Sequence, residues 1–147
     1  MEEFSRTELL IKKEGIDTLQ NSTVAIFGVG GVGGFVVEAL ARAGVGTLHI
    51  IDHDTVSVSN LNRQIIATHQ TIDQKKVEVM KERILSINPH CHVLTYDDFF
   101  LPETVDHFPF DEFDYIVDAV DTVTAKIKLV EIAQEKKNKI ISLMGTG

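Results

Sequence analysis

Two patterns of hydrophobic and polar residues alternate along the chain. Compact apolar and β-branched runs are typical of buried strands, which are expected at residues 23–27, 47–51, 92–96, 114–119 and 139–144. Between them, apolar positions spaced three or four apart predict helices at residues 35–43, 75–88 and 125–136. Almost continuously apolar strands that alternate with helices indicate a parallel sheet with helices on both faces. We therefore predict an α/β, Rossmann-like fold.

The segment ahead of the first strand predicts one more helix. Ser5 opens a Ser-x-x-Glu spacing, which is a capping box, and apolar residues follow it before Gly15. A short helix is expected at residues 5–14, followed by the Rossmann-like core at residues 23–147. The last apolar strand leads into a glycine turn at residues 145–147, so we expect the domain to be truncated there.

Composition narrows the class of protein. The chain has 147 residues, of which 44% are hydrophobic and 24% charged, which suits a single globular domain. The only cysteine, Cys91, cannot form an internal disulfide, which argues against a secreted disulfide-rich domain. The start of the chain is acidic, and no apolar stretch reaches the length of a membrane-spanning helix. A cytoplasmic protein without a membrane partner is expected.

Charge is distributed unevenly. The net charge is −8, and residues 84–125 contain nine acidic residues and no lysine or arginine. Affinity for nucleic-acid phosphates comes from lysine and arginine, so this stretch argues against nonspecific binding. DNA is not expected as a partner.

A glycine-rich loop between the first strand and the next helix is the strongest local signal. Gly28 permits a tight turn, Gly30 lets backbone N–H groups approach a phosphate, and Gly33 allows close packing of helix and strand. Asp52 ends the second strand, about where an acid meets ribose hydroxyls. A nucleotide site is therefore expected, for either a dinucleotide cofactor or ATP.

Further polar residues favour phosphoryl chemistry. Arginine and lysine can offset phosphate charge, amides can hydrogen-bond a triphosphate or ribose, and a carboxylate can hold Mg²⁺. The candidates are Arg63, Lys76, Asn60, Asn62, Asp118 and Asp121. Each also has a structural alternative, since the cations can be solvated and the two aspartates can cap the helix that follows.

These motifs together resemble a known family. Residues 28–33, 52–54, 59–64, 76–78 and 118–121 occur in the order and spacing of ubiquitin-activating-enzyme-like (ThiF-type) adenylation domains. Residues 4–10 and 39–46 look closest to the tRNA threonylcarbamoyladenosine dehydratase branch. Two positions depart from the family's pattern. Members commonly carry glycine where this chain has Asp73, and sulfur-carrier activators have asparagine where it has Thr122.

The resemblance implies an activity and its partners. In such enzymes, ATP with Mg²⁺ adenylates a carboxylate and releases pyrophosphate. In the dehydratase branch, the activated carboxylate of a modified tRNA nucleoside then closes into a ring. The implied partners are tRNA or a small carrier protein, together with a second copy of the chain in a homodimer. No cysteine for thioester transfer can be named.

The resemblance also implies roles for individual residues. Phosphate contacts would fall to Asn60, Arg63 and Lys76, with support from Gln64. Asp121 would place Mg²⁺, and Arg6 would contribute across the dimer. The implied catalytic residues are Arg63, Lys76, Asp121 and Arg6. Nucleotide binding would involve Gly28, Gly30, Gly31, Gly33, Asp52, Asp54, Asn60, Asn62, Arg63, Gln64, Lys76 and Asp118.

Three alternatives remain open at this point. The chain could activate the C-terminus of a ubiquitin-like sulfur-carrier protein. It could be an NAD(P)-binding oxidoreductase domain, in which Arg63, Lys76 and Asp121 would have no assigned role. It could also be a noncatalytic dimerisation or tRNA-docking fragment that keeps its nucleotide site.

Overall fold

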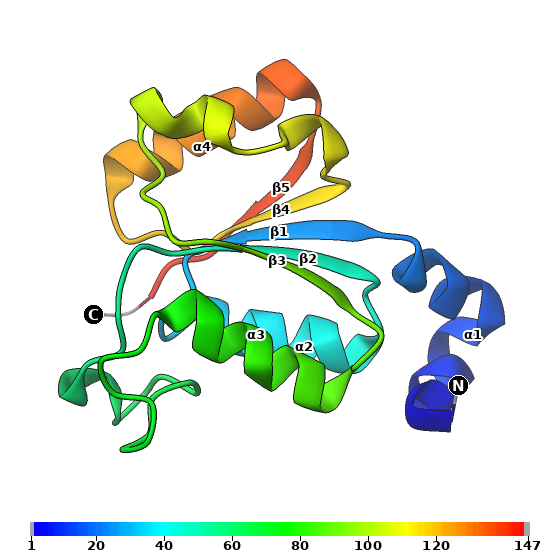
Figure 1. Cartoon of the computed structure of the whole chain (residues 1–147). Coiled ribbons are helices and arrows are strands. Elements are labelled where there is room, and N and C mark those ends of the chain that lie inside the picture. The colour runs from blue at the N-terminus through cyan, green and yellow to red at the C-terminus, as the bar shows by residue number, and fades with distance from the viewer. Residues whose placement is uncertain (1, 146–147) are drawn as a thin grey trace.

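The computed structural model of the chain describes residues 2–145 and contains one five-stranded sheet (Figure 1). Every strand pair is parallel, and the strand order is β3-β2-β1-β4-β5. The strands are β1 (Thr23–Phe27), β2 (Thr47–Ile51), β3 (His92–Tyr96), β4 (Tyr115–Asp118) and β5 (Lys139–Ser142). The predicted Rossmann-like fold is confirmed. The first three strands have the predicted bounds, and the last two are shorter than predicted.

Helices cover both faces of the sheet, as predicted (Figure 1). One face carries α2 (Gly33–Ala43) and α3 (Lys76–Ile87). The other carries α4 (Val123–Lys136) and the short 3₁₀ segments η3 (Pro102–His107) and η4 (Phe110–Glu112). Side chains alternate across β1, so Val24 and Ile26 join one core, while Ala25 and Phe27 join the other.

The second core is rich in phenylalanine. The ring of Phe27 lies within 5.1–5.7 Å, between centroids, of the rings of Phe100, Phe108 and Phe110. These three residues come from the segment between β3 and β4, which forms no regular strand or long helix. Aromatic packing therefore holds the segment between β3 and β4 against the sheet.

The N-terminal helix is longer than the predicted residues 5–14. The 3₁₀ segment η1 (Glu2–Phe4) runs directly into α1 (Ser5–Gln20), so Ser5 is already helical. The helix has Phe4 as its N-cap residue and no side-chain cap hydrogen bond, so the predicted capping box is wrong. An N-cap residue needs extended backbone, and the preceding 3₁₀ turn moves Ser5 out of that position.

A break inside α1 also explains Gly15. The chain leaves helical geometry at Lys12 (φ 63°, ψ 175°) and then resumes the helix as far as Gln20. A Cβ atom on Gly15 would lie 2.7 Å from the Cβ of Ile11 across this break. The sequence had suggested that Gly15 ends the helix. In the structure, the glycine instead permits a close approach inside the helix, which continues beyond it.

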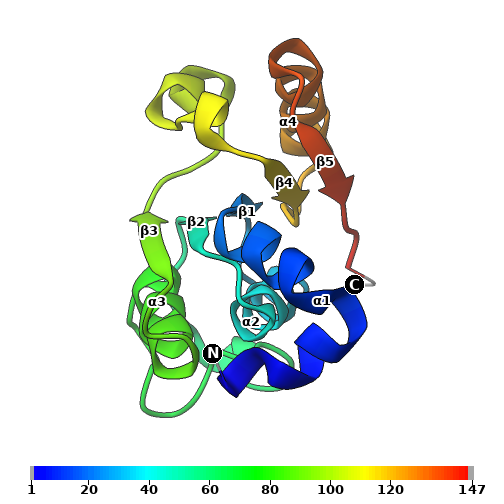
Figure 2. The same ribbon diagram turned by 90° about the vertical axis from the view of Figure 1, so that its right-hand side faces the viewer.

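Figures 1 and 2 place α1 beside the amino-terminal ends of the strands. Within the described part of the chain, no helix is both long and apolar enough to cross a membrane. Of the predicted glycine turn at residues 145–147, only Gly145 belongs to the described residues.

Candidate nucleotide site

A cavity of about 1130 Å³ lies at the carboxyl-terminal edge of the sheet. The loops that follow all five strands line it, from the glycine loop after β1 to Leu143 and Met144 after β5. It opens where the chain order reverses, between β1 and β4. Open parallel sheets bind ligands at this switch point.

The glycines of the loop divide into two kinds. Gly28 has a φ of +97°, and a Cβ atom there would overlap the carbonyl oxygen of Ala119. A Cβ atom on Gly33 would overlap the carbonyl oxygen of Gly28. Gly30 and Gly31 line the cavity, and a Cβ atom on either would have no neighbour closer than 3.5 Å. The first pair is required by the fold, whereas the second pair leaves open backbone beside the cavity.

Asp52 connects the end of β2 to the glycine loop. Its carboxylate accepts hydrogen bonds from the backbone N–H of Val29 (2.9 Å) and of Asp54 (2.8 Å). Asp52 and Asp54 both line the cavity, as predicted from their position after β2. The acid therefore has a structural role as well as a position that suits a ribose contact.

Two cations face the cavity. Lys76 begins α3, only 5% of it is exposed, and its Nζ atom lies 3.7 Å from a carboxylate oxygen of Asp54. Arg63 is exposed, and its guanidinium donates hydrogen bonds to the carbonyl of Ser59 and to Asn62 Oδ1. A buried ammonium with one distant carboxylate is poorly compensated, which favours an anion in the cavity.

The turn that carries Arg63 is built by Asn60. The 3₁₀ segment η2 (Val58–Asn60) is capped by Asn60 Oδ1, which accepts the backbone N–H of Ser57 (2.8 Å). The carbonyl of Asn60 accepts the N–H groups of Arg63 and Gln64. Asn60 and Asn62 are not among the residues that line the cavity, and Asn60 orders this turn. Their contacts with a nucleotide stay a prediction.

Gln64 is buried at the cavity wall with an unmet hydrogen-bonding need. It is 8% exposed, and its Oε1 atom has no hydrogen-bond partner among residues 2–145. A buried acceptor without a donor is costly. Gln64 therefore offers an acceptor to a ligand, beyond the supporting role expected from the sequence.

Asp118 and Asp121 follow the same strand but differ in surroundings. Asp118 is fully buried and accepts hydrogen bonds from Ser142 Oγ (2.9 Å) and Lys126 Nζ (3.3 Å), and it lies outside the cavity lining. Its role is to join β4, β5 and α4. Asp121 is exposed at the cavity, and within residues 2–145 no hydrogen bond or ion pair engages its carboxylate. Asp121 is therefore the carboxylate open to a metal ion.

Neither Arg6 nor Gly33 lines the cavity. Arg6 is exposed on α1, at the opposite end of the sheet. It cannot reach the nucleotide cavity of its own chain. Gly33 acts through packing, as the sequence predicted.

The lining residues that sequence reasoning missed include His53, Phe99 and Lys126. The His53 ring stacks on Phe99 with 3.6 Å between centroids. Lys126 donates to the carbonyl of Leu143 (2.7 Å) and pairs with Asp118. Lys126 could have been predicted at the cavity, because the alternation of strands and helices places the start of α4 at the carboxyl-terminal edge of the sheet. Phe99 gave no signal, because it belongs to the irregular segment after β3.

Asp73, where the family resemblance implied glycine, adopts a backbone conformation that favours glycine. Asp73 has a φ of 71°, in the left-handed region, and its N–H donates to the carbonyl of Val56 (2.8 Å). Aspartate enters this region more readily than most residues with a side chain. The loop that leads to Lys76 therefore keeps a conformation that glycine would also adopt.

Cys91 is not a candidate nucleophile. It is 5% exposed, and burial raises the pKa of its thiol to about 11. The thiol is therefore protonated at neutral pH, and only a thiolate attacks efficiently. This agrees with the sequence, in which no catalytic cysteine could be named.

Residues 4–147 match the model of the ThiF family. The chain belongs to the ThiF family. Among curated ThiF relatives, it is 48% identical to the tRNA threonylcarbamoyladenosine dehydratase of Bacillus subtilis, over 99% of this chain and 57% of the relative. It is 41% identical to the same-named protein of Haemophilus influenzae, over 94% of this chain and 53% of the relative. It thus spans little more than half of these relatives.

Solved structures of ThiF-like proteins agree with this assignment. The Escherichia coli dehydratase in complex with ATP superposes with a TM-score of 0.96 at 36% identity, over 99% of this chain and 60% of that one. Escherichia coli MccB with ATP gives a TM-score of 0.85 at 28% identity, over 95% and 43% of the two chains.

Proposed function

We propose that this chain is the ATP-binding adenylation domain of an enzyme that activates the carboxylate of threonylcarbamoyladenosine in tRNA and leads to its cyclisation by dehydration. The observation that carries the proposal is one cavity that joins the open backbone of Gly30 and Gly31 to the cations Arg63 and Lys76. The similarity to curated dehydratases and to an ATP complex supports the choice of nucleotide and substrate. Domain limits of residues 1–147, and a cytoplasmic location beside tRNA, belong to the same proposal.

The chemistry needs positioning more than proton transfer. A carboxylate oxygen attacks the α-phosphorus of ATP, the bond to pyrophosphate breaks, and an acyl-adenylate forms. The carboxylate is already ionised at pH 7, so no general base is required. Negative charge gathers on the α-phosphate and the leaving pyrophosphate, where Arg63 and Lys76 stabilise it.

A magnesium ion suits Asp121 better than the neighbouring acidic group. Asp52, His53 and Asp54 bring three ligand atoms within 4.8 Å of one another, but Asp52 already accepts two backbone N–H groups. A histidine nitrogen is also a poor ligand for Mg²⁺, which prefers carboxylate, phosphate and water oxygens. When bound, the ion neutralises phosphate charge, and Asp121 holds it at the cavity wall.

Binding of ATP in preference to NAD tests the choice of nucleotide. The two cations, Arg63 and Lys76, favour ATP over NAD, because a triphosphate carries more negative charge than the pyrophosphate of a dinucleotide. Calorimetric titration of the 147-residue chain with each ligand, with Mg²⁺ present, should give tighter binding of ATP. Tighter binding of NAD would instead support the oxidoreductase alternative and overturn the adenylation proposal.

A homodimer gives Arg6 a place in the reaction. Leu9 and Leu10 on the same helix are 82% and 84% exposed, so α1 presents apolar surface at the end of the sheet remote from the cavity. Burying that surface against a second copy is favourable, and it would carry Arg6 towards the partner's nucleotide. In this proposal, Arg6 stabilises phosphate charge across the dimer.

Mixing two inactive variants of the whole enzyme tests this arrangement. Arg6→Ala chains and Asp121→Ala chains should each be inactive, because each lacks one group at every site. Mixed dimers contain one site with both groups, so an equal mixture should regain roughly a quarter of wild-type adenylation. No recovery, once mass spectrometry has verified mixed dimers, would exclude Arg6 from the partner's site.

The 147-residue chain alone should not bind tRNA at physiological salt. Residues 84–125 carry nine acidic residues and no lysine or arginine, so tRNA contacts must come from elsewhere in the enzyme. An electrophoretic shift assay across a salt series checks this. Submicromolar, salt-sensitive binding would contradict the charge argument and leave the nucleotide site unaffected.

Activation of a carrier protein is the second candidate. The chain is 35% identical, over 88% of its length, to the molybdopterin-synthase adenylyltransferase of Haemophilus influenzae. Pyrophosphate exchange that depends on a carrier protein with a free C-terminus, and not on modified tRNA, would favour this candidate. ATP binding without exchange in the whole protein would indicate a noncatalytic fragment.

A further inference from the structure

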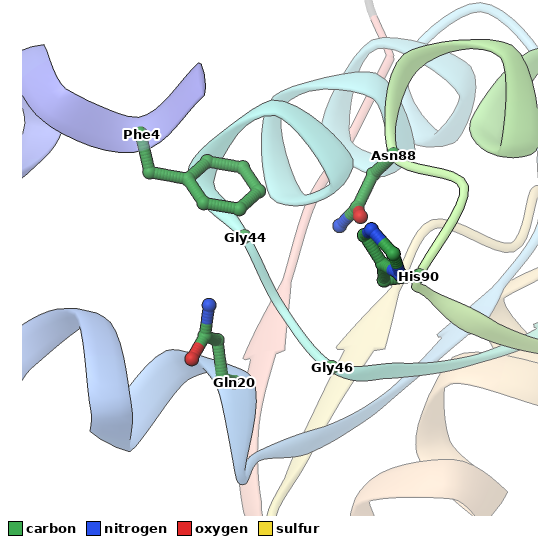
Figure 3. Close-up of a pocket in the computed structure, with 6 residues that line it drawn as sticks. All are labelled: Phe4, Gln20, Gly44, Gly46, Asn88 and His90. Atoms are coloured by element: carbon green, nitrogen blue, oxygen red, sulfur yellow. The ribbon is translucent and has the colours of Figure 1, made fainter. Parts of the chain in front are cut away.

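A second, smaller pocket of about 160 Å³ lies at the amino-terminal end of the sheet (Figure 3). The residues that line it are Phe4, Gln20, Gly44, Gly46, Asn88 and His90. They precede or flank β1, β2 and β3, whereas the nucleotide cavity follows the strands. The pocket is therefore separate from the proposed adenylation site.

Three helix C-termini meet at this pocket. Gln20 is the last residue of α1, Gly44 is the C-cap of α2, and Asn88 is the C-cap of α3. Each helix end carries partial negative charge from carbonyls that lack partners within the helix. The last turns of α1 and α3 contain no basic residue. In α2, the one basic residue, Arg42, is paired with Glu38 at 3.7 Å.

Asn88 adds a buried acceptor to this environment. It is 3% exposed, and its amide nitrogen donates to the carbonyl of Ala41. Its Oδ1 atom has no hydrogen-bond partner among residues 2–145. Figure 3 shows the Asn88 amide beside the His90 ring on one side of the pocket, with Phe4 and Gln20 on the other. An unmet buried acceptor calls for a ligand that donates.

We propose that this pocket binds an organic cation with N–H donors, in the form of an alkylammonium or alkylguanidinium group. The helix ends attract positive charge, Asn88 Oδ1 accepts an N–H group, and Phe4 supplies an apolar wall for the alkyl part. No lysine or arginine lines the pocket to repel a cation.

Titration of the 147-residue chain with ethylguanidinium chloride, followed by amide NMR, tests the inference. Saturable shifts are expected for the backbone amides of Gly44 and Gly46 and for the side-chain amide of Asn88. Choline has the same charge without N–H donors, so it should bind at least about tenfold more weakly, the effect of losing a hydrogen bond to a charged group. Shifts confined to the nucleotide cavity, equal binding of choline, or no saturable shift would overturn the proposal. The last result would mean that Asn88 Oδ1 is met by water alone.

Variants of Asn88 should change the affinity for ethylguanidinium in opposite directions. Asn88→Asp turns the neutral acceptor into a charged one and should tighten ethylguanidinium binding about fivefold, whereas Asn88→Leu should weaken it about tenfold. If Asn88→Asp fails to fold, Gln20→Glu should tighten binding instead. Thermal unfolding checks the fold. ATP affinity should stay unchanged in all three variants, which separates this pocket from the nucleotide site. No tightening in a folded acidic variant would contradict the inference.

The natural source of the cation is either a free polyamine or a basic side chain of a protein segment. Spermidine and a capped Gly-Arg-Gly peptide represent the two sources. Either ligand is expected to produce the shifts at Gly44, Gly46 and Asn88, and the tighter one identifies the source. If neither ligand produces these shifts, the pocket has no natural ligand of this chemical class and the proposal is wrong, even where ethylguanidinium itself binds.

Discussion

Replacing Gly33 with alanine should disrupt the glycine loop and abolish ATP binding. The added methyl group would overlap the carbonyl oxygen of Gly28, and the Cβ of Ala119 would lie only 3.2 Å away. The Gly28 oxygen cannot move without displacing the turn between β1 and α2, and the Ala119 Cβ cannot move without displacing the loop after β4. Overpacking of this kind costs about 3 kcal/mol. Chemical denaturation should show that loss of stability, and calorimetry should show no detectable binding of ATP.

Gly30→Ala is the matched control, because a Cβ atom there would lie 3.5 Å from Gln64 Nε2, an ordinary contact. Its stability should change by less than about 1 kcal/mol. Its ATP affinity should nonetheless fall about tenfold or more, because the methyl group would occupy the approach of phosphate to the backbone. Wild-type ATP affinity in Gly30→Ala would show that the nucleotide does not approach this part of the loop.

The sheet could be predicted from the sequence because each strand is a compact apolar run that ends at a glycine or a polar residue. Strands β1, β2 and β3 were placed without error, since burial on both faces leaves little choice of pattern. The N-terminal helix was predicted less well. The helix breaks at Lys12, where the residue type does not predict a left-handed backbone conformation. A glycine at position 15 is compatible both with a close contact inside a helix and with the end of a helix.

The site was predictable where function depends on backbone shape or on position after a strand. Gly28 and Gly33 have the geometry that their spacing implied, and Asp52 lines the cavity, although its contact with ribose stays a prediction. Residue type and spacing could not separate Asp118 from Asp121, and only the family resemblance assigned Mg²⁺ to Asp121. Burial shows that Asp118 is enclosed. The sequence also could not show Phe99, which reaches the cavity from an irregular segment held in place by aromatic packing.

Arg63 and Asp121 should be the most sensitive side chains for the reaction itself. Both line the cavity, and Arg63 is held in place by hydrogen bonds to Ser59 and Asn62, so its charge is already oriented before ATP binds. Preorganised charge of this kind is worth ~10² or more in rate. In the whole enzyme, Arg63→Ala and Asp121→Ala should each lower the kcat of adenylation by that factor, measured by exchange of pyrophosphate into ATP.

Conservative variants separate the two roles. Arg63→Lys keeps the charge but loses the planar fork, so it should recover only part of the rate. Asp121→Asn keeps the shape but loses the negative charge, and excess Mg²⁺ should restore activity to it and not to Arg63→Ala. Arg42→Ala, whose side chain pairs with Glu38 away from the cavity, should remain within about threefold of wild type. Losses below threefold in both alanine variants would remove Arg63 and Asp121 from the reaction and leave Lys76 as the cation on which adenylation depends.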